Sequence, residues 1–165
     1  MNVVLLEGPD GGGKSRLAET LLEREDDARF VHMSIPDERP YDYWMGRLEA
    51  ALTDGTLVID RLHWSEDVYG PLFRGGADLT RGEREDLEAW LTERRCVVVL
   101  CLPPYEVAMA NVRKAEGDKH HEPTQAMLVW LKYSEPWETT LPVVTYDYTV
   151  DSPPDIGRLR KEAYG

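Results

Sequence analysis

The sequence predicts an α/β fold in which a five-stranded parallel sheet carries helices on both faces. Five short apolar runs alternate with segments whose apolar residues recur at helical spacing. Residues 96–102 are apolar at every position, as expected of a strand that is covered on both faces. Residues 8–13, between the first strand and the first helix, are rich in glycine, which allows a short connection to turn sharply. The predicted strands are 3–6, 29–33, 56–60, 96–102 and 142–146.

Apolar spacing and stop signals define the helices expected in the first half of the chain. Residues 15–22 carry apolar side chains at helical spacing directly after the glycines. Residues 41–53 show the same spacing, with Trp44 and Leu48 on one side, and an Asp-Gly pair follows as the stop signal. Both segments therefore have one apolar face to pack on the sheet.

Capping residues mark the helices of the second half. Thr80 and Glu83 have the spacing of a capping box, which opens a helix before the strand 96–102. A proline in the first turn begins the helix 104–115. Another helix is expected from 123 to about 137, and a short one after Pro154.

Length, composition and charge limit the classes of function. The 165 residues suit one domain, 1–165, and 42% apolar residues suit a globular fold. A formal net charge of −12 repels a nucleic-acid backbone, so no nucleic-acid polymer is expected as a partner. A single nucleotide could still bind in a local basic pocket.

The two cysteines and the chain's hydropathy bear on location. Cys96 and Cys101 are five residues apart on one predicted strand, so they point to opposite faces and should not pair. Unpaired cysteines and the lack of a basic signal region favour the reducing cytoplasm. No apolar run approaches the ~20 residues that span a bilayer, so no membrane partner is expected.

The most specific motif runs from Gly8 to Ser15 and fits G-x-x-x-x-G-K-[ST] at every fixed position. This pattern between a strand and a helix is typical of a P-loop NTPase fold. The loop amides and the helix N-terminus would cradle the phosphates of ATP, Lys14 would reach the outer phosphates, and Ser15 Oγ would bind Mg²⁺. The residues expected to bind ATP are Gly8, Asp10, Gly11, Gly12, Gly13, Lys14, Ser15 and Arg16.

A charged pair, Asp60-Arg61, ends the third predicted strand. In parallel sheets the ligand lies beyond the carboxyl ends of the strands, so both residues should face the nucleotide. Asp60 is expected to hold the hydration shell of Mg²⁺, and the planar fork of Arg61 to grip a phosphate.

Three segments carry a resemblance to a known family. They are residues 7–15, residues 54–61 continuing to Ser65 and Tyr69, and residues 102–108. Together with the order of the elements, they make most of the chain similar to the thymidylate kinase group of P-loop nucleoside monophosphate kinases. Small phage-type deoxynucleoside monophosphate kinases have a similarly short layout.

The resemblance implies roles for four residues around the acceptor nucleotide. It places Asp10 near the sugar 3′-OH and Arg61 at the acceptor phosphate or base. It places Glu66 and Tyr69 near the base and sugar. Glu66 departs from the family's asparagine or glutamine, and because a carboxylate only accepts hydrogen bonds, it could select a guanine edge or a cytosine amino group.

Further roles are implied for the helix before the third strand. In the family an aromatic residue stacks on the base, and an arginine four residues later holds the phosphate; Tyr43 and Arg47 have this spacing. Trp44 is the rival stacking residue, and a core position for it remains equally open.

Charge on the transferred phosphoryl group must be neutralised from outside the glycine loop, because Gly11 carries no basic side chain. The candidates are Arg113, Lys114 and Lys119, in or beside a charged segment at about 113–122 that would act as a lid over ATP.

The expected activity is transfer of the γ-phosphoryl group of Mg·ATP to a deoxynucleoside 5′-monophosphate. The acceptor would be dTMP-like, with dGMP or a broader range left open, and the resemblance alone implies a homodimer. A deoxynucleoside kinase that uses Glu7 or Glu66 as a base is one alternative; a non-catalytic ATP-binding module is another. The expected catalytic residues are Lys14, Asp60, Arg61, Arg113 and Lys119.

Overall fold

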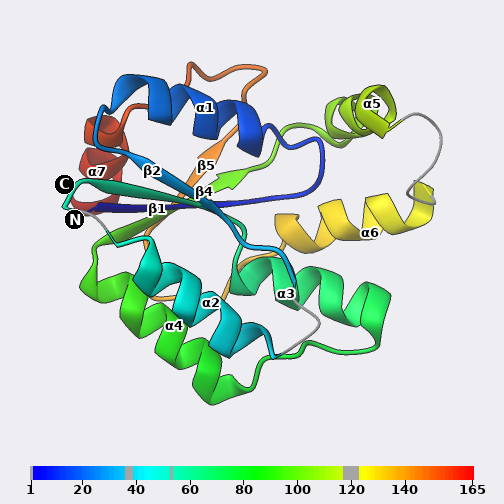
Figure 1. Cartoon of the computed structure of the whole chain (residues 1–165). Helices are drawn as coiled ribbons and strands as arrows, with labels where there is room; N and C mark the ends of the chain where they lie inside the picture. Colours follow the sequence, from blue (N-terminus) through cyan, green and yellow to red (C-terminus); the bar gives the residue numbers. More distant parts are fainter. Residues whose placement is uncertain (1, 36–38, 53, 117–122) are drawn as a thin grey trace.

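The computed structural model describes residues 2–35, 39–52, 54–116 and 123–165. Its sheet has five parallel strands in the order β2-β3-β1-β4-β5, which confirms the predicted α/β class. Figure 1 shows all the strands running toward the side where α3, α5 and α6 lie. The strands are β1 (Asn2–Glu7), β2 (Arg29–His32), β3 (Thr56–Asp60), β4 (Cys96–Cys101) and β5 (Val143–Tyr146).

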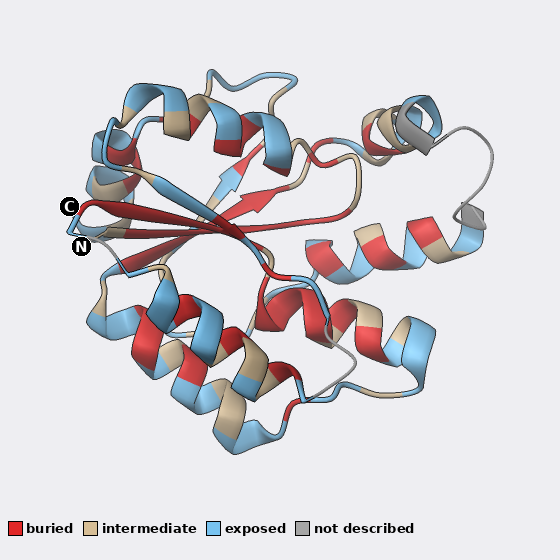
Figure 2. Ribbon diagram, viewed as in Figure 1, coloured by how far each residue is buried: buried red, intermediate tan, exposed pale blue. Residues whose placement is uncertain are grey.

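Helices cover both faces of the sheet (Figure 1). One face packs on α1 (Lys14–Arg24) and α7 (Ile156–Tyr164), through a buried cluster that includes Leu17, Leu21 and Leu159. The other face packs on α2 (Pro40–Ala50) and α4 (Arg81–Glu93). Figure 2 shows the strands buried between these two helical layers, which explains why the apolar runs lack polar alternation.

Three helices and a π-helical turn lie at the carboxyl edge of the sheet, around the site. They are α3 (His63–Tyr69), the π-helical turn Gly70–Arg74, α5 (Tyr105–Glu116) and α6 (Pro123–Ser134). The capping box at the start of α4 is present, as predicted. Helix α6 ends at Ser134, three residues before the predicted end of that helix.

The helix α3 was not predicted from the sequence. It is only seven residues long, and five of them are buried, because it is packed between the sheet edge and its neighbours. A helix that is buried on several sides shows no polar stripe, so periodicity cannot reveal it.

Both cysteines are buried and unpaired. Cys96 belongs to the core cluster of one face and Cys101 to that of the other, which confirms that they point in opposite directions. Among the described helices, none has the length and apolar character needed to cross a membrane.

Candidate active site

The glycine loop needs glycine at two positions because the chain approaches it closely there. A Cβ atom on Gly8 would lie 2.3 Å from the carbonyl oxygen of Cys101, and one on Gly11 would lie 2.2 Å from that of Ala108. The φ angles are +142° and +72°, which L side chains rarely adopt. The loop is therefore held against the end of β4 and against α5, with its opening beside α1.

Lys14 is folded back onto the loop. Its Nζ donates hydrogen bonds of 2.8 Å to the carbonyl oxygens of Gly8 and Pro9. Burial and the nearby Arg61 lower the pKa of Lys14 from 10.5 to about 8, although Asp10 and Asp60 oppose this shift. An anionic phosphate is a better partner for this ammonium group than two carbonyl oxygens.

Asp60 lies beneath the loop and fits a role in holding a metal ion. Its Oδ2 accepts a 2.9 Å hydrogen bond from Nδ1 of His32. Its Oδ1 is buried and has no hydrogen-bond partner within the described protein. A buried carboxylate oxygen without a partner is costly unless an ion or water binds it, so Asp60 suits the hydration shell of Mg²⁺. Ser15 is exposed and lines the same cavity.

Arg61 and Asp10 form an ion pair between the strand end and the loop. Arg61 has a φ angle of +67°, an unusual value for a non-glycine residue that directs its guanidinium across the carboxyl edge. Tyr69 donates a 3.3 Å hydrogen bond to Asp10, and its ring lies 5.0 Å from the Arg61 guanidinium carbon. Burial raises the pKa of Tyr69 to about 12, so its hydroxyl remains a donor.

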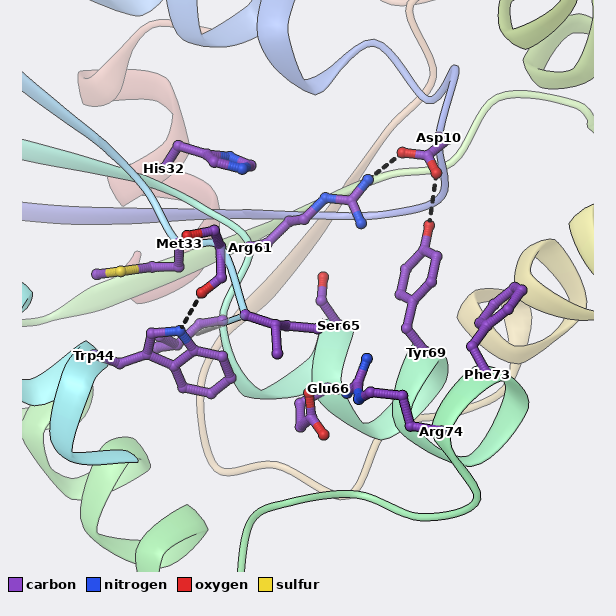
Figure 3. A pocket seen from close by; sticks show the side chains of 13 residues that line it. Asp10, His32, Met33, Trp44, Arg61, Ser65, Glu66, Tyr69, Phe73 and Arg74 are labelled. Atoms are coloured by element: carbon purple, nitrogen blue, oxygen red, sulfur yellow. Dashed lines mark hydrogen bonds and ion pairs between the residues drawn. The ribbon is translucent and has the colours of Figure 1, made fainter. Parts of the chain in front are cut away.

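Two cavities meet at this pair. One, of about 430 Å³, runs along the loop past Lys14, Ser15 and Asp60, and we call it the donor cavity. The other, of about 400 Å³, lies over α3, and we call it the acceptor cavity (Figure 3). Asp10, Arg61 and His32 line both. Two volumes that share a wall of charged side chains can hold two substrates whose reacting ends meet.

Glu66 lines the acceptor cavity, but its carboxylate already has partners. One oxygen pairs with Arg74, and the other accepts a 2.9 Å hydrogen bond from the backbone N–H of Asp78. The Glu66 side chain is 0% exposed, whereas that of Arg74 is 31% exposed. The group with hydrogen-bonding capacity left for a ligand is thus Arg74, which comes from the π-helical turn.

Glu7 is fully buried and cannot reach a substrate. It accepts hydrogen bonds from the backbone N–H of Leu62 at 2.8 Å and from Ser65 Oγ at 2.7 Å. Tyr133 of α6 adds a bond of 3.3 Å. The carboxylate thereby joins the end of β1 to the start of α3 and to α6. This arrangement speaks against the alternative that Glu7 is a catalytic base.

The residues expected on α2 lie at the side of the acceptor cavity. Trp44 is 1% exposed, packs in the core, and donates through Nε1 to the carbonyl of Ser34 at 2.9 Å, while its edge reaches the cavity. Arg47 donates a 2.9 Å hydrogen bond to the Tyr43 hydroxyl, as the four-residue spacing predicts. Neither Tyr43 nor Arg47 is among the described residues that line the cavity.

The expected cations of the lid are only partly described. Arg113 and Lys114 are exposed in the last turn of α5. Lys119 lies outside the described residues. Arg16 is exposed and lines the donor cavity, as do Gly11, Gly12 and Gly13.

Sequence reasoning missed four residues that the structure brings to the site. Asn111 donates a 3.2 Å hydrogen bond to the carbonyl of Gly11 and also bonds the Tyr148 hydroxyl. His32 and Arg74 line the cavities from β2 and from the π-helical turn. Only His32 had a signal, since it ends a predicted strand that neighbours the motif strand.

No family model and no curated protein sequence matches the chain. Solved structures do match it. YorR from Bacillus subtilis, determined in complex with phosphorylated GDP, has a TM-score of 0.75 and 20% identity, covering 98% of this chain and 92% of that chain. Deoxyadenosine kinase from M. mycoides with bound dATP has a TM-score of 0.61 and 12% identity, covering 92% and 93%.

The same deoxyadenosine kinase with dCMP and dCDP matches with a TM-score of 0.59 and 13% identity, covering 90% of this chain and 92% of that chain. These similarities, the parallel sheet and the glycine loop agree. The chain therefore has the P-loop NTPase fold, in the form shared with solved nucleotide-binding kinases.

Proposed function

We propose that the protein transfers the γ-phosphoryl group of ATP to the 5′-phosphate of a deoxynucleoside monophosphate, giving ADP and a deoxynucleoside diphosphate. The observation that carries the proposal is the pair of cavities that meet at Arg61 and Asp10. The donor cavity has the loop, Lys14 and Ser15 of an ATP site. The acceptor cavity has a cation, Arg61, at the end nearest the loop.

The chain's own residues would act mainly by positioning and by neutralising charge. Lys14 would leave the loop carbonyls for the outer phosphates, while Ser15 Oγ and Asp60 Oδ1 would hold Mg²⁺ and its waters. When bound, Mg·ATP supplies the phosphoryl group and further positive charge. Arg61 would align the acceptor phosphate, and Tyr69 with Asp10 would contact the sugar.

A phosphate acceptor fits these residues better than a hydroxyl acceptor. An acceptor phosphate is already anionic, so no base is required to activate it. The carboxylates considered as bases are both engaged: Glu7 by α3 and α6, and Glu66 by Arg74. A guanidinium at the junction also suits an anion rather than a neutral hydroxyl.

Recognition of the base would fall to Arg74, which Glu66 holds in place. A guanidinium donates two parallel hydrogen bonds, and among the bases guanine presents the two neighbouring acceptors O6 and N7. We therefore place dGMP first among the acceptors and dTMP, with one acceptor on that edge, after it. The YorR structure, with its guanine nucleotide, is consistent with this order.

A deoxynucleoside kinase is the second candidate. Its reaction needs a base for the 5′-hydroxyl, and the His32–Asp60 pair at the wall of the acceptor cavity could supply one. The structural similarity to deoxyadenosine kinase also keeps this candidate open.

The test is release of ADP from Mg·ATP with dGMP, dTMP, dCMP, dAMP and dUMP and with the matching deoxynucleosides. Turnover with monophosphates alone supports the proposal, and turnover with nucleosides alone supports the second candidate. ATP binding without turnover on any acceptor would overturn both. Lys14→Met is the control, since it removes the ammonium while leaving an unbranched side chain of similar length.

A further inference from the structure

His32 occupies a place between the two cavities that nothing in the proposed mechanism yet uses. We propose that His32 is a catalytic residue, whose ring Nε2 donates a hydrogen bond to the phosphoryl group as it passes from donor to acceptor. The inference rests on the proposed phosphoryl transfer.

The backbone places His32 beside the reacting groups. It is the last residue of β2, and in the parallel register it lies opposite Asp60 of β3, which itself lies opposite Leu6 of β1. Residues opposite one another in a parallel sheet point to the same face. Leu6 belongs to the core cluster under α1, so His32 and Asp60 share the face on which Lys14 begins α1.

The hydrogen bond to Asp60 fixes which ring nitrogen remains. A carboxylate can only accept, so Nδ1 of His32 must donate its hydrogen to Oδ2 over 2.9 Å. Nε2 is then the nitrogen left for a ligand, and the imidazole side chain is 52% exposed. Figure 3 shows the ring on the same side of the cavity as the extended side chain of Arg61.

The junction needs a further donor that its other residues do not supply. Of the three residues that line both cavities, Asp10 is an anion and Arg61 is already paired with it. Lys14 approaches from the loop, and Gly11 has no side chain to contribute. A ring that carries hydrogen on both nitrogens adds a cation beside the oxygens of the transferred group, where charge stabilisation matters most.

The step balances without a proton change at His32. The bond between the γ-phosphorus and the bridging oxygen of ATP breaks, and its electron pair leaves with ADP. A bond forms between that phosphorus and an oxygen of the acceptor phosphate. The hydrogen on Nε2 stays on the ring throughout, so His32 acts as a donor and not as a general acid or base.

Asparagine and glutamine separate the two ends of the ring. In His32→Asn the amide nitrogen occupies the place of Nδ1, so the contact with Asp60 is retained and the outer donor is lost. In His32→Gln the amide nitrogen occupies the place of Nε2, so the outer donor is retained and the contact with Asp60 is weakened. His32→Ala removes both, and Arg29→Asn, at the exposed far end of β2, is the matched control.

We expect kcat with the preferred monophosphate to fall about 10- to 100-fold in His32→Asn and His32→Ala, the lower part of the range for losing one donor to a transition state. His32→Gln should recover at least about fivefold over His32→Asn. KM for ATP should change less than threefold, and Arg29→Asn should match the wild type.

Each other result has one meaning. If His32→Asn keeps wild-type kcat, or if asparagine rescues better than glutamine, Nε2 does not act on the phosphoryl group and the inference is wrong while the kinase stands. If the wild type turns over no monophosphate, the proposed function and the inference fall together. Thermal unfolding of every variant shows whether a loss of kcat reflects loss of folded protein.

Discussion

Binding of ATP should take up a proton at mildly alkaline pH, and Lys14 should be the group that takes it up. In the empty site, burial and the nearby Arg61 bring the pKa of Lys14 to about 8. At pH 9 only about a tenth of these side chains are charged. A polyphosphate that brings the pKa back to its ordinary 10.5 would charge nearly all of them, so about 0.9 proton enters per ATP bound.

The same shift fixes how affinity depends on pH. Because binding raises the pKa of Lys14, its contribution to affinity is complete below about pH 8 and is lost as pH rises toward 10.5. The total is about 2.5 units, or about 3 kcal/mol at 1.36 kcal/mol per unit. This is an upper figure, since some of the burial remains when the nucleotide is bound.

Isothermal titration calorimetry measures the uptake directly. Mg·ATP is titrated at pH 7 and pH 9 in two buffers that differ in ionisation enthalpy, and the difference in heat gives the protons exchanged. We expect about 0.1 proton at pH 7 and about 0.9 at pH 9. Lys14→Arg is the control, because arginine stays charged at both values. Equal uptake by the wild type and Lys14→Arg at pH 9 would refute the reasoning.

Three further outcomes follow from buried contacts. Arg74→Met leaves the buried Glu66 carboxylate without its ion pair and should cost about 2–4 kcal/mol of unfolding free energy in urea, with Glu66→Gln restoring most of it in the double variant; additive effects would show that the two residues are not coupled. Gly8→Ala meets the backbone of β4 and should lower stability by more than about 2 kcal/mol, whereas Gly46→Ala, in α2 with nothing within 4 Å, should raise it by about 0.5–1; equal effects on Tm would contradict the steric argument. Tyr133→Phe leaves its buried polar partners short of a hydrogen bond and should cost about 1–3 kcal/mol in the same urea titration, so an unchanged midpoint would count against that network.

The sheet and the ATP loop were predictable because they depend on local patterns. Strands covered on both faces are uniformly apolar, and the loop needs glycine where the backbone turns or is approached closely. The position of Asp60 under the loop also follows from its place at a strand end, since all parallel strands end at one edge. These features need no knowledge of which side chains meet across the fold.

The acceptor cavity was less predictable because distant residues build it. Glu66 was expected to read the base, but Arg74, eight positions later, takes one of its oxygens, and no helical spacing relates the two. The π-helical turn that carries Arg74 has no sequence signature of its own. His32 depends on the register between β2 and β3, which a sequence alone does not specify.

The buried polar group at the end of β1 explains how an element without a sequence signal becomes the floor of the acceptor cavity. Glu7 lies opposite Leu100 and follows Leu6, so its side chain points to the face away from α1. There it accepts hydrogen bonds from the first turn of α3, including the backbone N–H of Leu62. A carboxylate at a helix N-terminus satisfies unpaired amides and favours the helix dipole. The residue that sequence reasoning offered as a base is therefore better explained as the anchor that fixes α3, and with it Tyr69, against the loop.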